Sequence, residues 1–252
     1  MMSDENLSKF TLTEHINELK IRIIKVIICF LISTCIAMYF ANDLYDFLAK
    51  PLIGAMNIQN NNFQRKLIFT GITEAFMTHM RLSICVGLGV SLPYIMFQLY
   101  SFLLPGLYSK EKKIIISFLI SSLFLTIIGF SIAYYIVAPI ACKFFIGFES
   151  LIRYNHHDIP IVLEARVSEY LSTIIHLILV FGIVFQLPII IVMLSKLNII
   201  NLEMLQKYRR HAIVINFIVA AIITPPDIIS QISLAIPMVL LYELSILLVR
   251  KL

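Results

Sequence analysis

Charged residues are scarce in this chain of 252 residues, and tryptophan is absent altogether. Asp, Glu, Lys and Arg make up 14% of the sequence, whereas about a quarter is typical of a soluble globular domain. Hydrophobic residues account for 60%. The shortage of charge excludes an ordinary soluble protein and indicates an integral membrane protein.

Cysteine is also rare, and the four cysteines stand singly, without the paired spacing or neighbouring histidines of a metal site. We interpret them as packing residues and expect neither a metal centre nor a cofactor. The apolar stretches contain no Ser/His, Asp/Asp or metal-binding helix motif, so we expect no enzyme. The basic residues lack the motifs of nucleic-acid-binding proteins, which argues against a nucleic-acid partner.

Three stretches carry no charge and reach the length of about 20 residues that a transmembrane helix needs. Two others contain only one or two charges, and a sixth is short and apolar. The predicted spans are residues 21–41, 82–104, 114–140, 170–195, 212–224 and 228–249. We therefore predict an all-α integral membrane protein of six transmembrane helices, forming one domain over residues 1–252.

The fifth of these spans is too short to cross a bilayer unaided. Residues 212–223 would form a helix of roughly 18 Å, well below the hydrocarbon thickness of about 30 Å. A short helix must thin the bilayer or be shielded by longer neighbours. Prolines within or near the ends of other spans should bend them, so we expect a concave, cupped arrangement with short fifth and sixth helices. These prolines are Pro93, Pro139, Pro188 and Pro237.

The basic residues predict the orientation of the six spans. Thirteen of the twenty Lys and Arg residues fall in the two tails and the even-numbered loops. Positive charge collects on the cytoplasmic side, so both termini are expected to be cytoplasmic.

Several polar residues in the apolar stretches need an explanation. Glu243 should lie near the cytoplasmic end, be protonated, or face a wet cavity. Gln186 either bonds a neighbouring helix of the same chain or docks a visiting helix. Asp227 and Gln231, four residues apart, should share a face, with Asp227 also able to cap its helix.

Two acids, Glu18 and Glu111, lie in cytoplasmic segments that are otherwise rich in lysine. Held on one rigid surface, they would grip two guanidinium groups through charge-assisted hydrogen bonds, as a dibasic ligand requires. Salt bridges to Arg22 or Lys112 are the simpler alternative.

A series of short motifs resembles one known family, TatC, the multi-spanning C subunit of the twin-arginine protein translocase. The resemblance covers nearly the whole chain, and the motifs occur in order along the six predicted spans. They are residues 15–22 (His-Ile-Asn-Glu-Leu-Lys-Ile-Arg), 39–43, 51–52, 74–76, 100–108 with Glu111, 185–188 (Phe-Gln-Leu-Pro), 224–227 (Thr-Pro-Pro-Asp) and 235–238.

The resemblance implies a receptor in the bacterial cytoplasmic membrane that binds the twin-arginine signal peptides of folded cargo proteins. Export would use the proton gradient, with single-span partner subunits of the TatA and TatB type and a homo-oligomeric receptor. The resemblance assigns signal-peptide binding to Glu18, Phe102 and Glu111, with Lys20 beside them. It assigns partner-helix or translocation contacts to Pro51, Phe76, Gln186, Asp227 and Gln231, to which we add Glu243.

Two residues depart from the family pattern. Lys20 stands where many relatives have arginine, which keeps the charge and loses the bidentate fork. Gln186 stands where some have glutamate, so any partner contact there must be a neutral hydrogen bond.

A rival interpretation is a proton-coupled small-solute transporter built on Glu243, Gln186 and Asp227.

Overall fold

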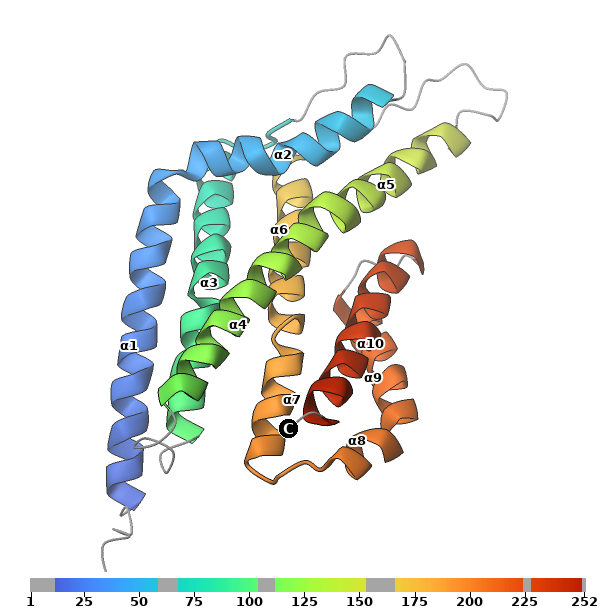
Figure 1. Ribbon diagram of the computed structural model, residues 1–252. Coiled ribbons are helices and arrows are strands. Elements are labelled where there is room, and N and C mark those ends of the chain that lie inside the picture. Colours follow the sequence, from blue (N-terminus) through green and yellow to red (C-terminus); the bar gives the residue numbers. More distant parts are fainter. Residues whose placement is uncertain (1–11, 59–67, 104–111, 153–165, 224–227, 251–252) are drawn as a thin grey trace, which may run out of the picture.

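The computed structural model describes residues 12–58, 68–103, 112–152, 166–223 and 228–250, which are almost entirely helical (Figure 1). The backbone is helical because a bilayer offers no hydrogen-bond partners, so that the backbone must satisfy its own polar groups. Apolar side chains cover these helices. The helices are α1 (Leu12–Tyr39), α2 (Ala41–Ile58), α3 (Glu74–Leu103), α4 (Lys112–Ile132), α5 (Ala138–Ile152), α6 (Val167–Val184), α7 (Leu187–Lys196), α8 (Leu202–Lys207), α9 (Arg209–Ile223) and α10 (Ile228–Arg250), with a π-helical turn, η2 (Ala133–Val137).

Five segments of the described residues are long and apolar enough to cross a membrane. They are Ile16–Tyr39, Glu74–Phe102, Ile116–Phe144, Val167–Lys196 and Gln231–Arg250. The predicted fifth span corresponds to α9, which has 15 residues and a length of roughly 22 Å. The predicted all-α membrane fold of six helices is confirmed, and α9 and α10 are its two shortest members.

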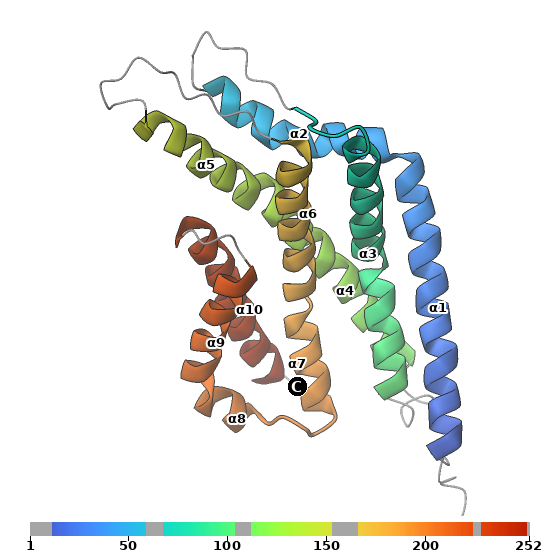
Figure 2. The ribbon, with the colours of Figure 1, turned by 180° about the vertical axis from the view of Figure 1, so that it is seen from behind.

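The helices form a curved wall with one helix lying across its top (Figures 1 and 2). Helix α1 packs along α3, α3 lies beside α6, and α10 packs against α7 and α9. The continuous α4–η2–α5 helix crosses this wall at an angle, and α2 lies across the ends of α3 and α6. We call the end covered by α2 the α2 end, and the opposite end, where α1 begins and α3 ends, the α8 end.

Two prolines interrupt the regular hydrogen bonding of their helices. Pro139 has no backbone N–H to donate to the carbonyl four residues earlier, and the wide turn η2 precedes it, with the Ala138 amide donating to Ala133. Pro188 follows the break between α6 and α7, where Gln186 lies. Pro93 and Pro237 lie inside the uninterrupted helices α3 and α10.

Glycine permits the closest helix crossings in the wall. A Cβ on Gly87 of α3 would lie 2.3 Å from Thr34 Oγ1 of α1. A Cβ on Gly182 of α6 would lie 2.2 Å from the Phe130 ring of α4. Both distances are too short for any side chain, so these glycines set the approach of α1 to α3 and of α4 to α6.

Candidate functional site

Glu18 and Arg22 form an ion pair one helical turn apart near the start of α1. Arg22 donates to Glu18 Oε1 from Nε at 3.0 Å and from Nη2 at 2.5 Å. The Arg22 side chain is 14% exposed and that of Glu18 is 30% exposed. The salt bridge that the sequence offered as the simpler alternative is therefore present.

Arg22 also binds the end of α3. Its Nη1 donates to Gln98 Oε1 at 3.2 Å, and its Nη2 donates to the backbone carbonyl of Ser101 at 3.0 Å. Gln98 in turn donates to the Tyr94 hydroxyl at 2.7 Å. One guanidinium thus joins α1 to the last turn of α3, where Phe102 follows Ser101.

The Glu18 carboxylate keeps one oxygen open. Both bonds from Arg22 end on Oε1, and no residue in the described part of the chain donates a hydrogen bond to Oε2. A partly exposed carboxylate with an unoccupied oxygen is suited to accept a guanidinium or ammonium donor. We call Glu18, Arg22, Gln98, Ser101 and Phe102 the inner-rim cluster.

The structure places the other residues of the expected binding site only in part. Phe102 is half-buried in the last turn of α3, and Lys20 is exposed on α1. Glu111 lies outside the described residues. Arg22 links Glu18 to the backbone of Ser101, the residue before Phe102, whereas the role of Phe102 and the pairing of Glu18 with Glu111 stay predictions.

Gln186 is completely buried and its amide is bonded within the chain. Its Oε1 accepts from Ser122 Oγ at 2.6 Å, and its Nε2 donates to Thr126 Oγ1 at 2.8 Å. Both partners belong to α4. The alternative of a bond to a neighbouring helix of the same chain is thus realised, and in this conformation a visiting helix finds no exposed surface of Gln186.

Glu243 lies in an ion pair at the α8 end, with Arg209 Nε at 2.5 Å from its Oε1. The carboxylate is therefore near a helix end and paired with the first residue of α9. Because Gln186 bonds α4 and Glu243 bonds α9, the structure does not support a shared transport site for the two residues. Asp227, the third residue of that alternative, lies outside the described residues.

The remaining predicted contact residues are dispersed. Pro51 is half-buried within α2, and Phe76 is 57% exposed in the first turn of α3. Gln231 donates to the backbone carbonyl of Phe217 on α9 at 3.3 Å. Pro51 and Phe76 belong to the α2 end of the molecule, away from the inner-rim cluster.

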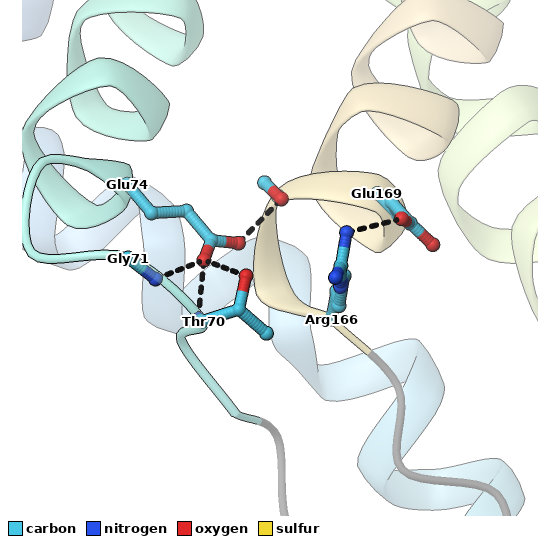
Figure 3. A network of polar contacts seen from close by, with 6 residues as sticks. Thr70, Gly71, Glu74, Arg166 and Glu169 are labelled. Atoms are coloured by element: carbon cyan, nitrogen blue, oxygen red, sulfur yellow. Dashed lines mark hydrogen bonds and ion pairs between the residues drawn. The ribbon is translucent and has the colours of Figure 1, made fainter.

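A second polar cluster, around Glu74 at the α2 end, is not indicated by the sequence analysis (Figure 3). Glu74 Oε2 accepts from the amides of Thr70 and Gly71 and from the Thr70 hydroxyl, and Oε1 accepts from Ser168 Oγ of α6. A parallel bridge joins Ile68 to Arg166 beside it. An acid in the first turn of a helix was the available signal, but its partner on α6 is 94 residues away.

Comparisons with known proteins agree with this architecture. The family model described as Sec-independent protein translocase protein (TatC) matches residues 14–237. A Sec-independent protein translocase protein TatC of Rickettsia prowazekii is 45% identical over 94% of this chain and 91% of its own length. The TatC protein of Aquifex aeolicus is 37% identical over 93% of this chain and 92% of its own length.

A crystal structure of the twin-arginine translocase receptor TatC superimposes with a TM-score of 0.78 and 37% sequence identity. The alignment covers 94% of this chain and 99% of that one. Sequence and fold therefore agree over nearly the full length, and the chain belongs to the TatC family of Sec-independent protein translocase proteins.

Proposed function

We propose that this chain is the receptor subunit of a twin-arginine translocase and binds the twin-arginine signal peptides of folded cargo proteins. Membership of the TatC family makes it a translocase component and not an enzyme. The resemblance to a twin-arginine translocase receptor over 94% of the chain supports the proposal.

The inner-rim cluster is the proposed recognition site. The observation that carries this assignment is the Glu18 carboxylate, held by Arg22 with one oxygen open at the boundary of the bilayer. An arginine of the signal peptide would donate to that oxygen, Phe102 would contact the flanking apolar residues, and Lys20 would adjoin them. Glu111 is proposed to bind the second arginine, as two guanidinium groups require two acceptors.

The proposed orientation puts the α8 end in the cytoplasm of a bacterial cell, with the chain in the cytoplasmic membrane as one six-span domain. The start of α1, the end of α3 and the segment from α7 to α9 all lie at this end (Figure 1). Lys196, Lys207, Arg209 and Arg210 belong to that segment. This clustering of positive charge supports a cytoplasmic location for both termini.

We further propose that single-span partners of the TatA and TatB type and other copies of the chain assemble on the helix surfaces that face the bilayer. Pro51, Phe76, Asp227 and Gln231 are the proposed contact positions, and the proton gradient drives export. Gln186 and Glu243 would take part only indirectly, by holding α4 and α9 in place, because both are engaged within the chain.

A binding titration tests the recognition site. A fluorescent twin-arginine signal peptide is titrated against the full chain in lipid nanodiscs, with a twin-lysine peptide for comparison. Glu18→Gln should weaken binding of the twin-arginine peptide about tenfold, the value of one charge-assisted hydrogen bond. Glu203→Gln is the matched control, since Glu203 is an exposed acid of α8 at the same end. Equal affinities of the Glu18→Gln and Glu203→Gln variants would refute the assignment.

A further inference from the structure

The proposed site for a positively charged ligand contains a positive charge of its own. Arg22 donates two hydrogen bonds to the carboxylate that is proposed to receive the ligand. By Coulomb's law alone, this arginine should repel a second guanidinium and weaken its binding. Its contacts indicate the opposite effect.

We propose that Arg22 is a positioning residue that holds Glu18 in the orientation required to bind an arginine side chain. The inference rests on the proposed function, because it concerns the same site. Arg22 does not touch the ligand in this arrangement. It acts by fixing the Glu18 carboxylate and by joining it to the end of α3.

The geometry of the guanidinium supports a positioning role. It is planar, and its donors point in fixed directions. Two N–H groups reach Glu18 Oε1, while others reach Gln98 Oε1 at 3.2 Å and the Ser101 carbonyl at 3.0 Å. Because α3 supplies two anchors, the plane of Arg22 is set by α3, and the plane of Arg22 in turn sets where Oε1 of Glu18 lies.

Arg22 bonds one of the two carboxylate oxygens of Glu18. Both hydrogen bonds from Arg22 converge on Oε1, and no donor from the described residues reaches Oε2. A competing internal ligand would instead occupy both oxygens in the bidentate geometry typical of arginine and carboxylate. The observed arrangement leaves room for a second guanidinium on the same carboxylate.

Arg22 also restricts the rotamers of the Glu18 side chain. A glutamate side chain has many rotamers, and fixing them on binding costs free energy. At 30% exposure the Glu18 side chain would be mobile without Arg22. A carboxylate that is already held loses less conformational entropy when the ligand binds. The gain opposes the repulsion between the two guanidinium groups, which solvent at a partly exposed site screens.

The test compares three single variants by titration with the twin-arginine peptide, using the full chain in nanodiscs. Arg22→Gln removes the charge and the fork, and Arg22→Lys keeps the charge and removes the fork. We expect both to weaken binding about tenfold. Lys25→Gln is the control, because it removes an equal charge from an exposed position one turn further along α1. We expect it to leave binding unchanged.

Tighter or unchanged binding by Arg22→Gln would overturn the inference, since repulsion or competition would then dominate. A loss in Arg22→Gln that Arg22→Lys restores would also overturn it, because the charge and not the fork would be responsible.

A double-mutant cycle separates positioning of Glu18 from a general effect on the fold. If Arg22 acts through Glu18, Arg22→Gln should have little further effect on affinity in a Glu18→Gln background. An equal loss in both backgrounds would overturn the inference. If the unmodified chain fails to prefer the twin-arginine over the twin-lysine peptide, the proposed function itself fails, and that result is distinct from any result of the cycle.

A measurement without ligand tests the structural half of the inference. Spin labels at Ile16 and Leu99, both exposed, report the distance between α1 and the end of α3 in a chain whose four cysteines are replaced. Arg22→Gln should broaden the distance distribution, and Lys25→Gln should not. An unchanged distribution in Arg22→Gln would contradict the role of Arg22 in joining the two helices.

Discussion

Two glutamates near opposite ends of α3 are bound by the protein in different ways. Glu74, at the α2 end, has both oxygens occupied: three donors from Thr70 and Gly71 reach one oxygen, and Ser168 reaches the other. Glu18, at the α8 end, has one oxygen held by Arg22, and none of the described residues donates a hydrogen bond to the other. An unoccupied acceptor oxygen, rather than the presence of an acid, therefore distinguishes a candidate ligand site from a structural carboxylate.

Gln186 extends the comparison into the middle of the bilayer. Its amide is fully buried and bonded to Ser122 and Thr126. Like the Glu74 carboxylate, the Gln186 amide finds its hydrogen-bond partners within the chain, although the two side chains lie in different surroundings. The comparison therefore predicts that substitutions at Gln186 and Glu74 affect stability, whereas substitutions at Glu18 affect binding.

The largest effect on stability is expected from Gln186→Leu. It removes the three interhelical hydrogen bonds that the amide makes to Ser122 and Thr126, which should lower the free energy of unfolding by roughly 1 to 2 kcal/mol. Unfolding in mixed micelles measures it, with Ser131→Ala as control, since the Ser131 hydroxyl bonds only the backbone of its own helix. A stable Gln186→Leu variant that no longer binds the signal peptide would contradict the assignment of Gln186 to stability and not to binding.

Glu74→Gln should have a smaller, local effect. An amide can accept on one oxygen only, so part of the set formed by Thr70, Gly71 and Ser168 loses its acceptor. We expect faster hydrogen exchange of the Thr70 and Gly71 amides and unchanged peptide affinity. Glu169→Gln is the control, because the Glu169 carboxylate forms an exposed pair with Arg166, at 3.4 Å, and does not bond Thr70, Gly71 or Ser168. Slow exchange that persists in Glu74→Gln would show that the carboxylate does not hold this segment.

Arg209→Gln tests the ion pair at the start of α9. The Arg209 side chain is 57% exposed and that of Glu243 is 29% exposed. Exposed pairs contribute little, so stability should fall by less than about 1 kcal/mol. The difference from the unmodified chain should shrink further at high salt, because screening weakens exposed pairs. A large loss that salt does not alter would indicate that Glu243 is effectively buried.

The smallest effect on stability is expected from Glu18→Gln. Its bond to Arg22 is a partly exposed pair between positions four apart on one helix, worth about 0.3–0.5 kcal/mol. Thermal unfolding of the peptide-free chain should therefore change little, while the affinity for the twin-arginine peptide falls. Were unfolding to change as much as in Gln186→Leu, Glu18 would be structural, like Glu74.

The membrane class and the helical architecture could be predicted from the uncharged apolar runs, since spanning length and charge depletion are properties of the sequence itself. The short α9 could be predicted because only residues 212–223 separate the basic Arg209-Arg210-His211 from the Thr-Pro-Pro-Asp motif at 224–227. The charge and position of Glu18 also made it a candidate before its geometry was known. The salt bridge of Glu18 was predicted only as one of two alternatives, the other being the binding of a dibasic ligand.

The polar clusters could not be predicted, because each depends on which faces of two helices meet. Gln98 and Ser101 become partners of Arg22 only when α1 packs along α3, 76 and 79 residues away. Ser122 and Thr126 share a helix face at a spacing of four, yet nothing in the sequence links that face to Gln186. Ser168 and Glu74 meet only because the first turns of α6 and α3 lie side by side in the fold.

The break between α6 and α7 has a mechanical consequence for the fourth span. The Gln186 carbonyl accepts the amides of both Ile189 and Ile190, each at 3.1 Å, while the side chain of the same residue is bonded to α4. A break of this kind would ordinarily be a place where a helix flexes. Here any change of angle between α6 and α7 must carry α4 with it, so the third and fourth spans are expected to tilt in concert.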